Sequence, residues 1–120
     1  MSTKKQAFGR WGEETAAAYL EKNGYTILER NFHTAHGEID IVASKQALLV
    51  FIEVKTRRSH AFAYPEDSVT KSKQAHMLSA AEAYLQAHPE SGESWQFDVI
   101  AIEKSPGGSP EIVHFENVIS

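Results

Sequence analysis

Charged side chains interrupt two apolar, β-branched segments in the middle of this chain. Asp40 lies within the run 39–43, and Glu53 and Lys55 follow the run 48–52. Both runs are typical of strands, and the short stretch between them suits a hairpin loop. We therefore expect the two runs to pair as antiparallel strands, in a fold that accommodates carboxylates within its sheet.

The alternation of strand side chains decides which of these charged groups share a face. A loop centred between residues 45 and 46 would place Asp40 opposite Phe51. It would likewise place Glu38 opposite Glu53. This register predicts one wholly apolar face and a second face that carries four charged side chains, Glu38, Asp40, Glu53 and Lys55. Repulsion among three carboxylates is costly unless a cation relieves it, so we interpret this face as a site rather than as a device that keeps a sheet edge soluble.

The composition is that of an ordinary globular protein, with 42% hydrophobic and 23% charged residues among 120. This length predicts one domain, residues 1–120. The absence of cysteine excludes a disulfide framework and a thiolate metal site. The longest apolar run, 47–52, has only the length of a strand, so we expect a cytoplasmic protein with no membrane partner.

The net charge of -4 is unevenly distributed along the chain. Residues 1–60 hold nine Lys and Arg against seven Asp and Glu, whereas residues 61–120 hold three against nine. A local positive surface can therefore lie beside the charged strands while the total remains negative.

The rest of the pattern predicts two helices and three further strands. A helix over 7–23, ended by Gly24, has an inward stripe that reaches Glu13 and leaves Glu14 pointing elsewhere. The other predicted elements are a strand over 25–30, a turn over 31–36, a helix capped by Asp67 or Ser68 that ends at 87, and strands over 95–103 and 111–115. The order αβββαββ predicts an α/β fold, with a mixed sheet flanked by two helices.

Several conspicuous residues are expected to be structural. Phe8 and Trp11 are typical of core or anchoring side chains rather than of a base-stacking platform. Asp98 interrupts an apolar strand, where a capping or ion-pairing role is the simplest interpretation. His33 and His36 are expected to be solvated loop residues rather than zinc ligands. For Glu13, the competing interpretation is a favourable interaction with the helix dipole.

Basic residues follow the charged strand. Arg57 and Arg58 begin a predicted loop, 56–66, in which basic and aromatic residues alternate, as suits phosphates and unstacked bases. A solvated loop is the equally weighted alternative. Lys73 lies in the first turn of the second helix, where its charge opposes the helix dipole, and we expect it to contact phosphate.

The predicted face has the groups that phosphodiester hydrolysis requires. Asp40 and Glu53 can hold Mg²⁺, or Mn²⁺ in its place, through oxygen ligands, with the backbone carbonyl of Val54 as a further ligand. Lys55 can orient the attacking water and stabilise charge on phosphorus. Glu13 can complete the site from the helix.

These motifs resemble those of a known nuclease superfamily. The segments 37–40 and 51–57 look like the D…ExK signature of the PD-(D/E)XK nucleases, with Ile39 where the superfamily's name has proline. More closely, the chain resembles the YraN-like family of bacterial proteins, which is related in sequence to archaeal Holliday-junction resolvases. Segment 9–13, the pair Lys73-Gln74 and segment 96–99 also fit, so the likeness covers nearly the whole chain.

The resemblance implies a restriction-endonuclease-like fold and Mg²⁺-dependent cleavage of branched or damaged DNA. It assigns Mg²⁺ to Asp40 and Glu53, catalytic assistance to Lys55, and a supporting carboxylate to Glu13. The expected nucleic-acid-binding residues are Arg10, Arg57, Arg58 and Lys73. A resolvase is expected to act as a symmetric homodimer on a symmetric junction. The alternatives are a nucleic-acid-binding or adaptor module with little or no turnover, and a protein-interaction domain that uses its acidic second half.

Overall fold

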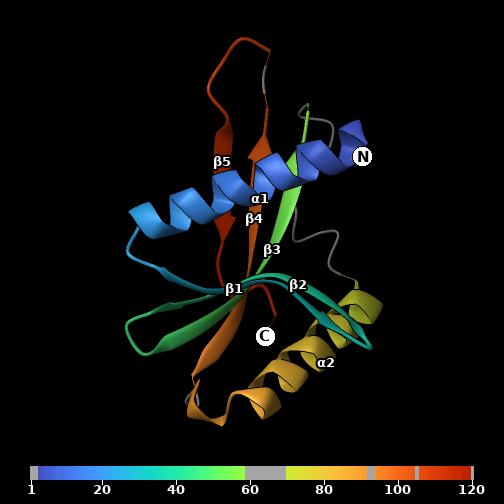
Figure 1. The fold of residues 1–120 in the computed structure, drawn as a ribbon, viewed down its shortest axis with the longest axis vertical. Coiled ribbons are helices and arrows are strands. Elements are labelled where there is room, and N and C mark those ends of the chain that lie inside the picture. The colour runs from blue at the N-terminus through green and yellow to red at the C-terminus, as the bar shows by residue number, and fades with distance from the viewer. Residues whose placement is uncertain (1–2, 59–69, 92–93, 105, 120) are drawn as a thin grey trace.

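The computed structural model has the predicted α/β architecture and describes residues 3–58, 70–91, 94–104 and 106–119 (Figure 1). Its elements are α1 (Lys4–Lys22), β1 (Thr26–Thr34), β2 (Gly37–Lys45), β3 (Leu48–Arg57), α2 (Lys71–Ala87), the 3-10 helix η2 (Pro89–Ser91), β4 (Trp95–Glu103) and β5 (Glu111–Phe115). The five strands form one sheet in the order β1-β2-β3-β4-β5. The sheet is mixed, as predicted, because β3 and β4 pair in parallel while the other neighbours are antiparallel.

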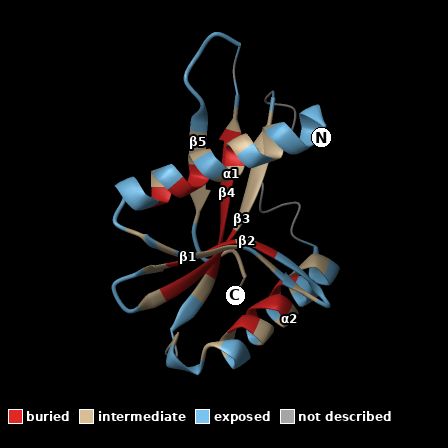
Figure 2. Ribbon diagram, viewed as in Figure 1, coloured by how far each residue is buried: buried red, intermediate tan, exposed pale blue. Residues whose placement is uncertain are grey.

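The two helices cover opposite faces of the sheet, and each face has its own core (Figure 2). Ile41 and Ile52 pack with the α1 residue Leu20 on one face, whereas Val42 and Phe51 pack with α2 on the other. This division follows from the alternation of side chains along each strand. No helix among the described residues is both long enough and apolar enough to cross a membrane.

The register of the β2–β3 hairpin differs from the prediction. Val42, not Asp40, lies opposite Phe51, and Leu48 lies opposite Lys45. The turn therefore consists of two residues, 46–47, rather than the four expected. Gln46 adopts the positive φ of 56° that tight hairpin turns favour. The predicted register is wrong by two residues on one strand, and the observed pairing ends at Ile41 opposite Ile52, next to Asp40 and Glu53.

One side chain leaves its predicted face. Ile39 was expected on the wholly apolar face with Ile41, but it packs in the α2 core beside Val42. The pairing of β2 with β3 ends at Ile41 opposite Ile52, and from there towards Gly37 the strand pairs with β1 and with no other described strand. Strict alternation across the hairpin therefore does not extend past Ile41.

Three predicted boundaries are also corrected. α1 begins earlier than predicted, because Thr3 and Gln6 form a capping box at its start. The N-cap of α2 is Thr70, whose hydroxyl accepts a hydrogen bond from the Lys73 amide. The predicted caps, Asp67 and Ser68, lie outside the described residues. β1 continues to residue 34 by pairing with β2, so the predicted turn over 31–36 shrinks to 35–36.

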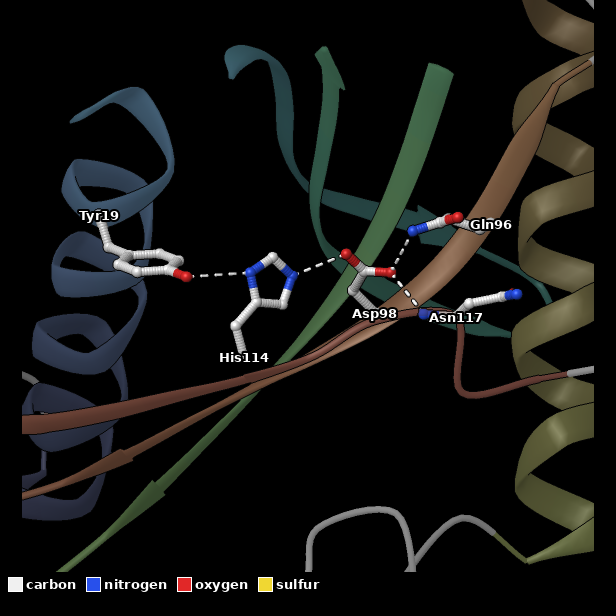
Figure 3. A network of polar contacts seen from close by, with 5 residues as sticks. All are labelled: Tyr19, Gln96, Asp98, His114 and Asn117. Atoms are coloured by element: carbon white, nitrogen blue, oxygen red, sulfur yellow. Dashed lines mark hydrogen bonds and ion pairs between the residues drawn. The ribbon is translucent and has the colours of Figure 1, made fainter. Parts of the chain in front are cut away.

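A polar network around Asp98 joins α1, β4, β5 and the C-terminal segment (Figure 3). The fully buried Asp98 carboxylate lies 2.7 Å from His114 Nε2, and it accepts hydrogen bonds from Gln96 Nε2 and the Asn117 amide. Tyr19 Oη lies 3.1 Å from His114 Nδ1. The contact with His114 has the geometry of the predicted ion pair, whereas Asp98 caps no helix among the described residues, since the amide that it binds belongs to the C-terminal segment.

Candidate functional site

Asp40 and Glu53 lie where β2 and β3 separate. The β2–β3 pairing ends at Ile41 opposite Ile52. Asp40 immediately precedes Ile41, and Glu53 immediately follows Ile52. The Asp40 carboxylate reaches across the opening and accepts a hydrogen bond of 2.8 Å from the Val54 amide through Oδ2. The fork thus brings the two predicted metal-binding carboxylates together.

Two lysines approach Glu53 from different elements. Lys73, in the first turn of α2, forms an ion pair with Glu53 Oε1. Lys55 Nζ, two residues along β3, lies 3.6 Å from the same oxygen. The second carboxylate oxygen, Oε2, is buried and has no hydrogen-bond partner among the residues that the structure describes. One oxygen of Glu53 is therefore ion-paired, and the other lacks a described partner. A buried polar atom without a partner is uncommon.

Asp40 is strongly perturbed by this environment. Burial raises the pKa of its carboxyl from the usual 3.8 to about 7, against the opposing effect of the Val54 hydrogen bond. The neighbouring charges of Glu13, Glu53 and Glu38 add to the increase, in that order. A cation bound beside these carboxylates would offset their mutual repulsion and favour the ionised form of Asp40.

The lysines respond in opposite directions. Burial lowers the pKa of Lys55, and the adjacent Lys73 and Arg57 charges lower it further, although Glu53 opposes this effect. Burial also disfavours the charged form of Lys73, but the contacts with Glu53 and the charge of Asp40 outweigh it and raise the pKa of Lys73. Lys73 is therefore the firmly charged partner of Glu53, and Lys55 is the lysine that releases a proton more readily.

Glu13 lies close to Asp40, as the helix prediction required. It is half-buried on α1 and lines a surface hollow with Glu38 and Arg10. Glu14, the next residue, is exposed and forms an ion pair of 2.8 Å with Arg30. The expected division between these two glutamates is confirmed.

The predicted nucleic-acid-binding residues come from different elements of the fold. Lys73 faces Glu53, and the exposed Arg10 lines the hollow beside Glu13. Arg57 ends β3, and the guanidinium of Arg58 lies 4.0 Å from the centre of the Phe8 ring. The remainder of the predicted basic loop, 59–66, lies outside the described residues.

Sequence reasoning did not single out Lys104, a cation that lies near the predicted residue Arg58. Lys104 Nζ lies 5.3 Å from the centre of the Trp11 ring, which is stacked on Phe8. Trp11 is anchored on the α1 core, as predicted, but both rings remain half-exposed. A single lysine after a strand forms no sequence motif that would indicate a binding role. Lys104 lies near Trp11 because β4 pairs in parallel with β3, and sequence patterns did not specify this pairing.

The residues at the fork fit a hard divalent cation. Asp40 and Glu53 supply carboxylate oxygens, the unpartnered Oε2 of Glu53 lacks a counter-charge, and the backbone carbonyl of Val54 lies between Glu53 and Lys55 in sequence. Within the described ranges, no group of three or more His, Asp or Glu side chains is arranged to hold a metal ion. An ion would therefore take its other ligands from water or a substrate.

The sequence matches the family described as "Uncharacterised protein family UPF0102" over residues 12–102. A UPF0102 protein of Syntrophomonas wolfei is 50% identical over 109 residues, which cover 91% of this chain and 94% of that protein. One from Syntrophotalea carbinolica is 43% identical over 115 residues, covering 96% and 93% of the two chains. One from Trichlorobacter lovleyi is 46% identical over 113 residues, covering 93% and 89%. The residues at the fork, all of α2 and α1 from Gly12 onward lie inside the matched residues 12–102.

Proposed function

The chain belongs to the uncharacterised protein family UPF0102, and we propose that it is a Mg²⁺-dependent endonuclease that hydrolyses phosphodiester bonds in DNA. The observation that carries this proposal is the fork, where Asp40, with a pKa raised to about 7, adjoins Glu53 with its buried, unpartnered oxygen. A carboxyl that is hard to ionise and a carboxylate with one oxygen still available, beside two lysines, suit a cation and a phosphate together.

The motif resemblance supports the same activity. The fork holds the residues that match the D…ExK signature of the PD-(D/E)XK nucleases, and the likeness to the YraN-like family and to Holliday-junction resolvases favours branched or damaged DNA. On this proposal the protein acts in the cytoplasm, as a homodimer where its substrate is symmetric.

Each residue then has a defined task. Asp40, Glu53 and the Val54 carbonyl would hold Mg²⁺ or Mn²⁺, which supplies an activated water and neutralises charge on the phosphate. Lys55 Nζ donates a hydrogen bond to the attacking water or to a non-bridging oxygen, and burial, which lowers its pKa, makes it release a proton more readily than an ordinary lysine. Glu13 adds negative charge beside Asp40 and strengthens the attraction for the cation.

Cleavage assays test this proposal directly. The protein is incubated with branched, nicked, single-stranded and duplex DNA in the presence of Mg²⁺ or Mn²⁺. Cleavage should disappear in Asp40→Asn, Glu53→Gln and Lys55→Ala, because each change removes an ion ligand or the lysine that supports attack. Glu13→Gln should weaken cleavage, because it removes the negative charge beside Asp40. Glu14→Gln is the matched control, since Glu14 lies on the same helix but faces Arg30. Survival of every substrate with both ions would contradict the proposal.

A second candidate is a nucleic-acid-binding module that does not cleave. The observation in its favour is that Lys73 and Lys55 already approach one oxygen of Glu53, so that part of the negative charge is neutralised by the chain itself. For such a module, DNA binding without divalent ions would be unchanged in Asp40→Asn, and neither ion would produce cleavage.

A further inference from the structure

Two cations stand over two stacked aromatic rings at the N-terminal end of α1. The rings of Phe8 and Trp11 have centres 5.6 Å apart and planes within 8° of parallel. Arg58 lies over Phe8 and Lys104 over Trp11. We propose that this aromatic–cation cluster binds single-stranded nucleic acid and guides an unpaired arm of the substrate towards the fork, an inference that rests on the proposed nuclease function.

The fold builds the cluster from three distant parts of the sequence. β3 and β4 run in parallel and end together, and the Lys104 amide donates a hydrogen bond of 2.9 Å to the Arg57 carbonyl. α1 crosses the end of β3 at Gly12, where an added Cβ would lie 2.1 Å from Thr56 Oγ1. This close packing fixes the first turns of α1 above the strand ends. The position of the cluster is therefore set by backbone contacts and not only by its own side chains.

The chemistry of the cluster suits nucleotides. A guanidinium stacked on a ring keeps its N–H groups directed outward in its own plane, where they can bind phosphate oxygens. Arg58 and Lys104 are exposed, and the aromatic rings beneath them are half-exposed. Phosphates beside flat, partly apolar groups are what single-stranded nucleic acid offers, because its bases are free to stack on side chains.

The relation of the cluster to the fork favours a single strand over a duplex. Arg58 directly follows β3 and lies five residues beyond Glu53, at most about 16 Å at the rise of a strand. Alternation places Arg58 on the α1 face, whereas Glu53 contacts Lys73 of α2 on the other face. A nucleic acid that contacts both must bend around the end of the sheet within a few nucleotides. A duplex, with its persistence length of about 150 base pairs, strongly resists this bend.

A second lysine–aromatic contact, distant from the cluster, provides a control for the loss of charge. Lys45 Nζ lies 5.0 Å from the centre of the Tyr25 ring, so it is also a lysine over an aromatic ring. This pair lies beyond the C-terminal end of α1, a helix of 19 residues that is about 28 Å long. Lys45→Gln therefore removes a similar contact and the same charge far from the proposed path.

The test measures the anisotropy of a fluorescein-labelled oligothymidylate in EDTA, so that binding is separated from cleavage. Arg58→Gln and Lys104→Gln should each weaken binding on the order of tenfold at about 50 mM salt and lower the salt slope by about 0.7, the share of one phosphate contact on a single strand. Lys45→Gln should leave both quantities unchanged. A duplex of the same length should bind less tightly and be less sensitive to the two changes.

A second readout does not depend on charge. The chain has two tryptophans, so Trp95→Phe leaves Trp11 as the sole indole. Binding of the oligothymidylate should then change Trp11 fluorescence, and inorganic phosphate should not reproduce the full change, because it offers no base to contact the rings. Circular dichroism establishes that each variant is folded.

Wild-type affinity in both Arg58→Gln and Lys104→Gln, or no oligothymidylate binding by the wild type, would overturn this inference. Equal losses on a duplex would overturn its preference for single strands. The nuclease proposal is decided separately, since DNA cleavage that depends on Asp40 but not on Arg58 or Lys104 would leave that proposal standing while the cluster loses its role.

Discussion

At the scale of single residues, the Asp40 carboxyl makes stability depend on pH. Its pKa is raised from 3.8 to about 7 by burial and then by the charges of Glu13, Glu53 and Glu38, against the Val54 hydrogen bond. Between these values the folded chain keeps a proton that the unfolded chain releases. The free energy of unfolding should therefore fall as the pH rises from about 4 to about 7, and this contribution should then stay constant.

Asp40→Asn should remove that dependence. An amide keeps an oxygen for the Val54 hydrogen bond but carries no charge. In the absence of divalent ions the variant should be more stable than the wild type at about pH 8, by at most about 4 kcal/mol, and the difference should vanish near pH 4. Urea unfolding across this range measures it. A variant that is less stable than the wild type throughout would contradict the assigned burial of Asp40.

Substitution of the buried Asp98 should lower the free energy of unfolding, whereas Asp40→Asn should raise it. Asp98→Ala leaves His114 and the Asn117 amide without their partner in a buried setting, which should cost about 3–5 kcal/mol of unfolding free energy. Tyr19→Phe removes only the outer hydrogen bond of the network and should cost about 1 kcal/mol. Chemical denaturation distinguishes these values, and similar losses in both variants would show that the network does not depend on its carboxylate.

The residues at the fork could be identified from the sequence because both are charged residues in or beside apolar runs joined by a short loop, and any hairpin pairing of these runs brings them near one another. Asp40 and Glu53 share a site although the predicted pairing was wrong by two residues. Lys73 and Lys104 illustrate the limit of this reasoning. The ion pair of Lys73 with Glu53 and the contact of Lys104 with Trp11 each depend on how distant elements pack, which no local pattern specifies.

At the scale of elements, the packing of α1 on β3 depends on the absence of a side chain at residue 12. A Cβ there would clash with Thr56 Oγ1, whereas a Cβ at Gly9 would meet no atom within 4 Å. Gly12→Ala should therefore destabilise the fold by about 1–3 kcal/mol. Gly9→Ala should stabilise α1 by about 0.5–1 kcal/mol, because alanine is the better helix former.

A double-mutant cycle checks the assigned contact. Thr56→Ala removes the hydroxyl that an alanine at residue 12 would strike, so the double variant should recover part of the loss. Additive losses in thermal or urea unfolding would show that residue 12 is constrained by something other than Thr56.

The order and type of the elements were predictable from hydrophobic periodicity, but their ends were not. The hairpin turn lacks the usual Asn-Gly signal, and Gln46 adopts the left-handed conformation instead, so the strands extend further than the apolar runs indicate. The caps at Thr3 and Thr70 are single polar residues among several candidates. In both cases the competing local signals are close in energy, and tertiary packing decides between them.

At the scale of the whole molecule, a cation bound at the fork should stabilise the folded chain, because the unfolded chain has no such site. At a concentration of Mg²⁺ about 100 times the dissociation constant, the gain is about 2.7 kcal/mol. Thermal unfolding at about pH 8 should therefore show a Mg²⁺-dependent rise in the midpoint, absent in Asp40→Asn and in Glu53→Gln. Calorimetric titration supplies the dissociation constant. An equal rise in all three proteins would place the ion elsewhere.

The parallel pairing of β3 with β4 also bears on how the molecule assembles. β1, β2 and β3 are contiguous antiparallel neighbours that can pair as soon as they are synthesised, whereas β4 joins β3 only after α2 has been made. Glu53 therefore reaches its strand before the Lys73 ammonium that neutralises it is available. Docking of α2 is thus the step at which a nascent chain adds the Lys73 ammonium to a hairpin in which Glu53 already has Lys55 beside it.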